Sequence, residues 1–367
     1  MRELEEKPKK NSMRKRVRLL AAVTLVSVVV AFSCLMLALI LFLHQHKVAE
    51  DYIDRGDMEA EEVEGGNAPK YTQEEVDALL AEMESDSQAG GRQILLEEMR
   101  TSLEDGTSAV NLFRALYPDQ VVYVDDNRYW FHDIRQDWKK NPFDVNQLVL
   151  DEEGFMTYPI DGTPQRKLGV DVSRFQGVID WEKVKNAGVE YAIIRVGMRG
   201  YESGKLVEDE QAKANIDGCV ANGIPFGVYF FSEAINETEA IEEADTVLSM
   251  IQGYQLGLPV YIDIEQVSSA SNRCKDMTKE ERTKVAKVFL DRISAAGYKP
   301  GIYGNLKSFL VLLDLQEIQD YTKWFACYNI PVYYPYDYDI LQYSEKGTID
   351  GIPEPVDLNI ALTENYR

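Results

Sequence analysis

The stretch Leu258-Pro259-Val260-Tyr261-Ile262-Asp263-Ile264-Glu265 is an apolar run of strand-forming residues that ends in two carboxylates. Similar short apolar runs recur along the second half of the chain, at 168–172, 190–197, 225–231, 299–304, 323–328 and 338–343. Helical patterns fill several of the gaps, and two of them begin at the cap residues Asn236 and Thr278. Strands alternating with helices predict an α/β fold with a parallel sheet. Because the later gaps are too short for helices of normal length, we expect residues 166–367 to form an irregular βα (TIM-like) barrel.

The beginning of the chain predicts a membrane anchor. Residues 19–43 are 25 residues without a charge, long enough at 1.5 Å per residue to span a hydrocarbon core of about 30 Å. Residues 1–18 carry eight Lys or Arg and three Glu, so the positive-inside rule places this tail in the cytoplasm. A cleaved signal peptide is the alternative, but its apolar region is shorter and is followed by small residues, whereas His44 follows here. We therefore expect a single-pass transmembrane helix with the rest of the chain outside the cell.

Residues 44–165 are expected to form a linker and a small module. Residues 44–70 are acidic and contain two adjacent glycines, a composition typical of a solvated linker. The sequence of 71–165 predicts a small extracellular α+β module, which is a candidate site for a protein partner. Its expected elements are a helix that begins at Thr72 and is interrupted at Gly90-Gly91, helical pieces at 94–99 and 110–116, and a hairpin of 121–124 with 128–131. Trp130 and Trp138 fit packing in a small core better than carbohydrate binding.

The composition excludes several classes of function. The 62 acidic residues outnumber the 39 basic ones and give a formal charge of −23, which argues against nucleic-acid binding. No histidine follows His132, so the barrel holds neither a Ser-His-Asp or Cys-His catalytic group nor a histidine-based zinc site. Phosphate-binding and dinucleotide-binding glycine motifs are missing as well. We therefore expect no metal and no cofactor, and we interpret Cys219, Cys274 and Cys327 as buried thiols.

Carboxylates remain as the candidate catalytic groups. Asp263 and Glu265 lie two residues apart on one strand, so they point to the same side with Cα atoms about 6.6 Å apart. Asp171 ends the first strand, and Asp357 belongs to the last strand, which lies beside the first if the barrel closes. A single acidic residue at a strand end often only caps a turn, but burying two together is costly and raises the pKa of one of them. A proton donor beside an ionised carboxylate is what glycoside hydrolysis requires.

The motifs that carry these carboxylates resemble, in order, those of the family 25 glycoside hydrolases. They are Asp171-Val172-Ser173-Arg174-Phe175-Gln176-Gly177 with Ile179-Asp180-Trp181, Gly227–Phe231, Tyr261–Glu265, Gly301–Asn305, Trp324–Tyr328, Gln342-Tyr343-Ser344 and Asp357-Leu358-Asn359. The match covers residues 168–362. Members of this family are lysozymes that cut bacterial peptidoglycan between N-acetylmuramic acid and N-acetylglucosamine, so the resemblance implies this activity and an irregular βα barrel.

The resemblance also implies roles for individual residues. Glu265 matches the general acid, and Asp263 matches the carboxylate that assists the 2-acetamido group of the substrate, with net retention of configuration. Asp171 and Asp357 match the other two acidic residues of the groove. The residues expected to bind substrate are Tyr229, Tyr261, Tyr303, Asn305, Trp324, Tyr328, Gln342, Tyr343 and Asn359, although Trp324 also suits the core.

Two positions that line the groove differ from the pattern of the family. Phe230 stands where the family frequently has His, and Leu341 stands where Trp often precedes the Gln-Tyr pair. Both departures affect the preference for sugar subsites more than the acid. The tyrosines around Pro335, at 333, 334, 336 and 338, suit either stacking on sugars or packing within a loop.

The sequence as a whole predicts a membrane-anchored muramidase of a bacterial cell, acting on peptidoglycan from the outer side of the membrane. One alternative is a catalytically silent protein that binds cell-wall glycan or serves as a scaffold. The costly acidic cluster argues against this alternative, because a pure binding protein does not need it. The other alternative is a chitinase-like glycosidase, since acidic pairs two residues apart also end a barrel strand there.

Overall fold

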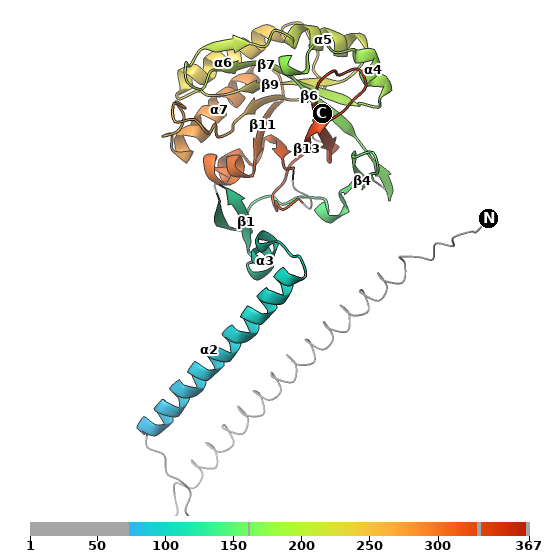
Figure 1. Ribbon diagram of the computed structural model, residues 1–367. Coiled ribbons are helices and arrows are strands. Elements are labelled where there is room, and N and C mark those ends of the chain that lie inside the picture. The colour runs from blue at the N-terminus through green and yellow to red at the C-terminus, as the bar shows by residue number, and fades with distance from the viewer. Residues whose placement is uncertain (1–72, 126, 161, 329–331, 365–367) are drawn as a thin grey trace, which may run out of the picture. The chain divides into compact units, whose positions relative to one another are not determined.

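The computed structural model describes residues 73–125, 127–160, 162–328 and 332–364 (Figure 1). The chain divides into two units, residues 1–89 and 90–367. The predicted tail 1–18, membrane span 19–43 and linker 44–70 lie outside the described residues. Within the described part of the chain, no helix is both long and apolar enough to cross a bilayer.

Helix α2 (Gln73–Glu104) is longer than the sequence predicts. The predicted interruption at Gly90-Gly91 is wrong, because the helix continues through both glycines. Each glycine costs about 1 kcal/mol relative to alanine in a helix interior, but the flanking residues are rich in Glu, Leu, Met and Ala, which favour the helix. A Cβ atom at either position would meet nothing within 4 Å, so no packing requirement explains these glycines.

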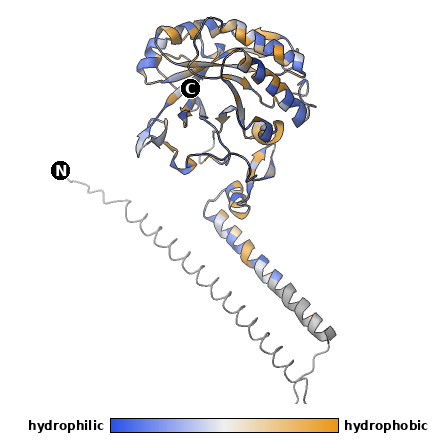
Figure 2. Ribbon diagram, turned by 180° about the vertical axis from the view of Figure 1, so that it is seen from behind, coloured by the Kyte–Doolittle hydropathy of each residue, from blue (hydrophilic) through white to orange (hydrophobic). Residues whose placement is uncertain are grey.

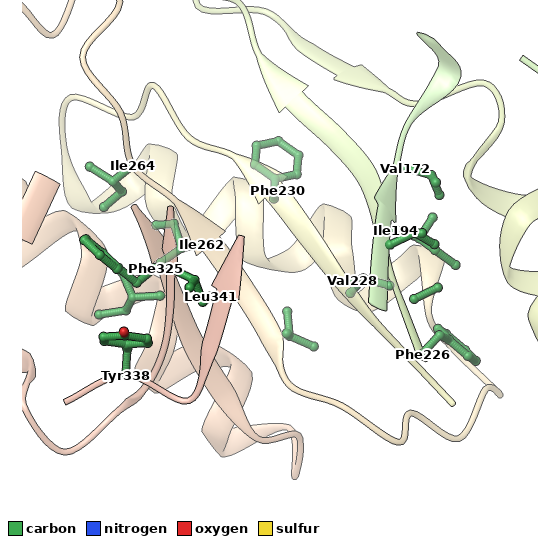
Figure 3. Packing of buried hydrophobic residues seen from close by; sticks show 14 of the residues in the cluster. Val172, Ile194, Phe226, Val228, Phe230, Ile262, Ile264, Phe325, Tyr338 and Leu341 are labelled. Atoms are coloured by element: carbon green, nitrogen blue, oxygen red, sulfur yellow. The ribbon is translucent and has the colours of Figure 1, made fainter. Parts of the chain in front are cut away.

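The predicted barrel is confirmed. Its strands are β6 (Leu168–Val172), β7 (Tyr191–Arg199), β8 (Leu206–Glu208), β9 (Phe226–Phe231), β10 (Val260–Asp263), β11 (Pro300–Asn305), β12 (Thr322–Ala326), β13 (Ile340–Gly347) and β14 (Val356–Ala361). They pair in the order β6-β14-β13-β12-β11-β10-β9-β7-β8, and β6 also pairs with β7, so eight strands close on themselves and β8 extends the edge at β7. Residues such as Tyr261 and Trp324 fill the inside. Alternating residues such as Val228, Ile262 and Phe325 belong to the hydrophobic cluster on the outer face, part of which Figure 3 shows.

Two helices of the barrel, α6 (Glu237–Met250) and α7 (Lys279–Ala295), begin where the sequence predicts, and the helices are distributed unevenly along the chain. The others are α4 (Trp181–Asn186), α5 (Ala212–Ala221) and α8 (Leu315–Ile318). Asn236 caps α6, and Thr278 caps α7 in a capping box with Glu281. Hydrophilic and hydrophobic residues alternate along these helices, as in helices that cover a sheet on one side (Figure 2). Between β12 and β13 the described residues contain no helix, which agrees with the predicted irregularity.

The last strand corrects the prediction of a parallel sheet. β14 runs antiparallel to both of its neighbours, β13 and β6. Only residues 348–355 connect β13 to β14, and this is too short for the crossover helix that a parallel pair needs. β14 therefore enters the sheet in the opposite direction, and Asp357 near its start pairs with Asp171 near the end of β6. The reversal brings the two carboxylates to the same end of the barrel.

The segment before the barrel contains α3 (Ala109–Leu116), β1 (Gln120–Asp125), β2 (Arg128–Asp133), the 3-10 turn Val145–Gln147, β3 (Val149–Leu150), β4 (Met156–Ile160) and β5 (Thr163–Gln165). β1 and β2 form the predicted hairpin, in which Asp125 lies opposite Arg128. Tyr123, Leu148 and Met156 belong to the same hydrophobic cluster as the outer face of the barrel. This segment and the barrel therefore share one core, and the boundary between 165 and 166 stays a prediction.

The tyrosines that follow β12 belong to this shared core. Tyr334, Tyr336 and Tyr338 are at most 3% exposed, so packing rather than sugar stacking explains them. The rings of Trp138 and Tyr336 lie 5.1 Å apart, in agreement with the predicted packing of Trp138. The same prediction is wrong for Trp130, which is 40% exposed on the hairpin.

Candidate active site

The structure brings the four predicted carboxylates to one end of the barrel. Asp171 lies near the end of β6, Asp263 ends β10, Glu265 follows two residues later, and Asp357 lies at the start of β14. Asp171 and Asp263 are each 3% exposed, whereas Glu265 and Asp357 are partly exposed. The two buried carboxylates therefore lie beneath the two that a substrate can reach.

Asp171 and Asp357 form the first pair. The side-chain amide nitrogens of Gln342 and Asn359 each donate a hydrogen bond to Asp171 Oδ2 at 2.8 Å. Burial raises the pKa of Asp171, while these amide donors and a hydrogen bond from Asp357 act in the opposite direction. Burial and the neighbouring charge of Asp171 raise the pKa of Asp357 to about 9. At neutral pH, Asp357 therefore carries a proton and donates it in a hydrogen bond to the Asp171 carboxylate.

Asp263 and Glu265 form the second pair and lie within hydrogen-bonding reach of each other. Burial raises the pKa of both carboxyls, and the charges of Glu265 and Asp171 raise the pKa of Asp263 further. Two groups coupled in this way titrate as a pair, and both shifts favour the protonated form of the pair. One oxygen of Asp263 is buried and has no hydrogen-bond partner among the described residues.

A hydrogen-bonded chain of neutral side chains orients the amides around Asp171. The hydroxyls of Tyr303 and Tyr328 both donate to Gln342 Oε1 at 2.8 Å, which turns the amide nitrogen of Gln342 toward Asp171. Trp324 Nε1 donates to Asn359 Oδ1 at 2.7 Å and does the same for Asn359. These tyrosines and Trp324 thereby orient the two amide hydrogen bonds that lower the pKa of Asp171 against the larger effect of burial.

The residues predicted to bind substrate fall into three groups in the structure. Those lining the open cleft are Tyr303, Asn305 and Tyr328, and Tyr229 is partly exposed beside the carboxylates. Those fully enclosed beneath the carboxylates are Tyr261, Trp324, Gln342 and Asn359, which support the acidic residues. Tyr343 lies elsewhere, buried in the outer hydrophobic cluster near Met156, because it follows Gln342 on β13 and points to the opposite face.

A cleft of about 580 Å³ opens beside Glu265. The barrel lines it with Glu265, Gln266, Ser268, Tyr303, Asn305, Leu306, Lys307, Ala326, Cys327, Tyr328 and Tyr333. Residues before the barrel line it as well, namely Ser108, Val110, Asn111, Arg114, Tyr123, Val124 and Asp125. The sequence offers no signal for this second group, since none of its residues stands in a catalytic or binding motif.

The cysteines do not provide a competing nucleophile. Cys219 and Cys274 are buried free thiols, as predicted, and burial raises the pKa of both. Cys327 is only partly buried and lines the cleft, so the prediction of burial is too strong for this residue. No histidine follows His132 to act as its base.

Comparisons with known proteins agree with the motifs of the barrel. Residues 170–352 match the model of the glycosyl hydrolases family 25. The uncharacterized protein YegX of Escherichia coli K12 is 30% identical over 200 residues, which cover 52% of this chain and 68% of YegX. The autolytic lysozyme of Clostridium acetobutylicum is 25% identical over 192 residues, with 52% of this chain and 54% of the lysozyme covered. The autolysin LytC from Streptococcus pneumoniae has a TM-score of 0.49 and 23% identity, with 65% of this chain and 57% of LytC covered.

Replacing Asp357 by Asn should stabilise the protein at pH 7. The folded-state pKa of Asp357 is raised to about 9, above its value in the unfolded chain, so the folded state binds the extra proton and stability falls as the pH rises between these two values. Asn imitates the protonated side chain and removes this loss, without an effect below about pH 4. We expect the Tm at pH 7 to rise by a few degrees, since 1 kcal/mol shifts the Tm of a domain of this size by about 2–4 °C.

Differential scanning calorimetry at pH 4 and pH 7 measures this difference. Asp350→Asn, at a carboxylate whose side chain is 77% exposed, is the matched control and should leave the Tm unchanged. A lower Tm for Asp357→Asn than for the wild type at pH 7 would show that Asp357 is ionised in the folded protein.

Proposed function

The chain belongs to the glycosyl hydrolases of family 25, and we propose that it is a membrane-anchored muramidase that cleaves the β-1,4 bond between N-acetylmuramic acid and N-acetylglucosamine in peptidoglycan. The observation that carries the proposal is the coupled pair Asp263 and Glu265, which lies beside a second acidic pair and whose member Glu265 lines the cleft. The autolytic lysozyme among the relatives supports the choice of peptidoglycan as the substrate.

Glu265 is the proposed general acid. It is the member of its pair that is partly exposed to the cleft, and burial raises its pKa. A protonated carboxyl there donates to the oxygen of the leaving sugar as the glycosidic bond breaks. Tyr303 and Tyr328 in the same cleft wall shield this step from water on one side.

Asp263 is proposed to assist the substrate's own acetamido group rather than to attack the sugar. It is 3% exposed and lies beneath Glu265, so a direct approach to the anomeric carbon is less accessible than a contact with a projecting acetamido N–H. Its oxygen without a partner accepts that hydrogen bond and orients the acetamido oxygen toward the anomeric carbon. As positive charge develops on the acetamido group, the Asp263 carboxylate stabilises it, and the product retains its configuration.

Digestion of purified peptidoglycan tests the activity and the assignment of Glu265. The wild-type protein should release fragments whose new reducing ends are N-acetylmuramic acid, identified by mass spectrometry. Glu265→Gln preserves shape and hydrogen bonding but removes the transferable proton, so kcat should fall by about 10²–10⁴. Glu182→Gln, at an exposed position of α4, is the matched control and should keep full activity. New N-acetylglucosamine reducing ends, or cleavage of chitin alone, would favour the chitinase-like alternative, and intact peptidoglycan would favour a silent binding protein.

The stereochemistry of the product tests the role of Asp263. Asp263→Asn should lose most of the activity without any trapped glycosyl-enzyme, because the acetamido group supplies the nucleophile. A thiazoline analogue of N-acetylmuramic acid should inhibit the wild-type protein, since it imitates the cyclised intermediate. An inverted product in an NMR time course, or a sugar bound covalently to Asp263, contradicts this mechanism.

The membrane anchor is part of the proposal and rests on residues 19–43, which carry no charge and follow a basic tail. In cells that express the full chain, the protein should sediment with membranes, resist alkaline carbonate and dissolve only in detergent. Protease added to cells stripped of their wall should degrade the barrel but leave the tail 1–18 protected. A soluble secreted form that begins near residue 49 would contradict the anchor. A protein partner for residues 71–165 stays a prediction, and part of this segment lines the cleft.

A further inference from the structure

The segment that precedes the barrel forms one wall of the cleft that contains Glu265. Its contribution comes from α3 and β1, with Asn111, Arg114 and Tyr123 among the lining residues. This wall is fixed to the barrel, because Tyr333 Oη donates to the carbonyl of Gln120 at 2.8 Å. A second link is the ion pair between Lys307 and Asp125. These two contacts therefore hold the wall against the barrel.

Arg114 is the cation of this wall, and its guanidinium is held rigidly. Its Nε donates to the carbonyl of Val122 at 3.0 Å, and its Nη1 donates to Asn111 Oδ1 at 3.1 Å. The centre of the guanidinium lies 4.2 Å from the centroid of the Tyr333 ring, a cation–π contact. Three neutral groups thus orient the side chain, which leaves it little freedom to lose when it binds a ligand.

The charge of Arg114 has no counter-ion within the described part of the chain. No carboxylate there lies within 4.0 Å of its guanidinium, whereas Lys307, the other cation lining the cleft, is paired with Asp125. Arg114 is also half-buried, and this burial lowers its pKa. A desolvated cation without a partner is unfavourable, so an anionic group that enters the cleft gains more from it than from a solvated surface arginine.

This proposal rests on the proposed muramidase activity and specifies its substrate further. We propose that Arg114 binds a carboxylate of the peptide stem attached to the muramic acid, so that the enzyme prefers peptide-bearing glycan over glycan from which the stems were removed. A carboxylate matches the planar donors of the guanidinium in two parallel hydrogen bonds. The neutral sugar ring offers no such group, and the acidic residues around Glu265 repel an anion from the rest of the site. Arg114 therefore sets where the stem lies.

The experiment compares two soluble substrates, glycan chains with intact peptide stems and the same chains after an amidase has removed the stems. The wild-type protein should show a kcat/KM at least 10-fold higher on the stem-bearing chains, the scale of a charge-assisted hydrogen bond. Arg114→Gln should abolish this preference through a higher KM on stem-bearing chains, with an unchanged rate on bare chains. Arg114→Lys should restore part of the preference, because it keeps the charge but not the planar donors. The preference should also weaken as the salt concentration rises.

Two controls separate the possible results. Arg128→Gln, at an exposed position of the β1–β2 hairpin that follows α3, should behave like the wild type on both substrates. The affinity of a soluble disaccharide-peptide for Glu265→Gln, with and without Arg114→Gln, measures the contact when no cleavage occurs, and the second substitution should weaken binding about 10-fold. Cleavage of both substrates at equal rates, an equal loss on both for Arg114→Gln, or equal binding by the two variants would overturn the role of Arg114. Absence of cleavage with the binding difference intact would overturn the muramidase activity alone.

Discussion

The burial of carboxyl groups at one end of the barrel is the constraint on which the rest of the site depends. Asp171 and Asp263 are almost completely enclosed, and no arginine or lysine forms an ion pair with either in the described part of the chain. Without an ion pair, the cost of burial is reduced by retaining protons and by accepting amide hydrogen bonds. Both solutions occur, since burial and the charge of Asp171 raise the pKa of Asp357 to about 9 and Asp171 accepts from Gln342 and Asn359. The chemistry of the site follows from this compromise.

The direction of β14 makes the first pair possible. A parallel last strand would carry Asp357 to the opposite end of the barrel from Asp171, whereas the antiparallel strand sets the two residues opposite each other. The same reversal places Asn359 where its amide reaches Asp171 at 2.8 Å. The short connection between β13 and β14 is thus tied to the function, because it fixes the direction of the strand. The buried pair lowers the stability of the folded protein in exchange for this arrangement of carboxyls.

Much of the barrel and its carboxylates is predictable from local sequence, because each signal depends on neighbouring residues. The spacing of Asp263 and Glu265 predicts through strand geometry that they point to the same side, although β10 ends at Asp263. Thr278 and Glu281 identify the start of α7 as a capping box. The short apolar runs predict the strands of the barrel, because a strand that is buried on both faces of the sheet consists of consecutive apolar residues. The family motifs add Asp171 and Asp357 to the predicted site. The sequence does not show that β14, the strand of Asp357, runs antiparallel to its neighbours.

The remaining features differ from the sequence prediction for separate reasons. Tyr343 packs on the outer face, as strand alternation from Gln342 indicates, although the family motif groups it with the site. Gly90-Gly91 lies inside a helix because the high helix propensity of the flanking residues outweighs the low propensity of the two glycines. A rule that ends every helix at a glycine pair ignores this balance. Arg114 reaches the cleft only because the hairpin that follows it packs on the loop of Tyr333, more than two hundred residues later. No local pattern encodes such a juxtaposition.

The central claim is that the acidic cluster retains protons at neutral pH. Titration of the Asp and Glu side-chain carboxyl carbons by ¹³C NMR, in the wild-type protein and in Glu265→Gln, measures this most directly. The account predicts that carboxyls of the cluster titrate above about pH 6, and that the variant changes the step shared by Asp263 and Glu265. Titration of every Asp and Glu below about pH 5, with no change in the variant beyond the loss of one carboxyl, would contradict it.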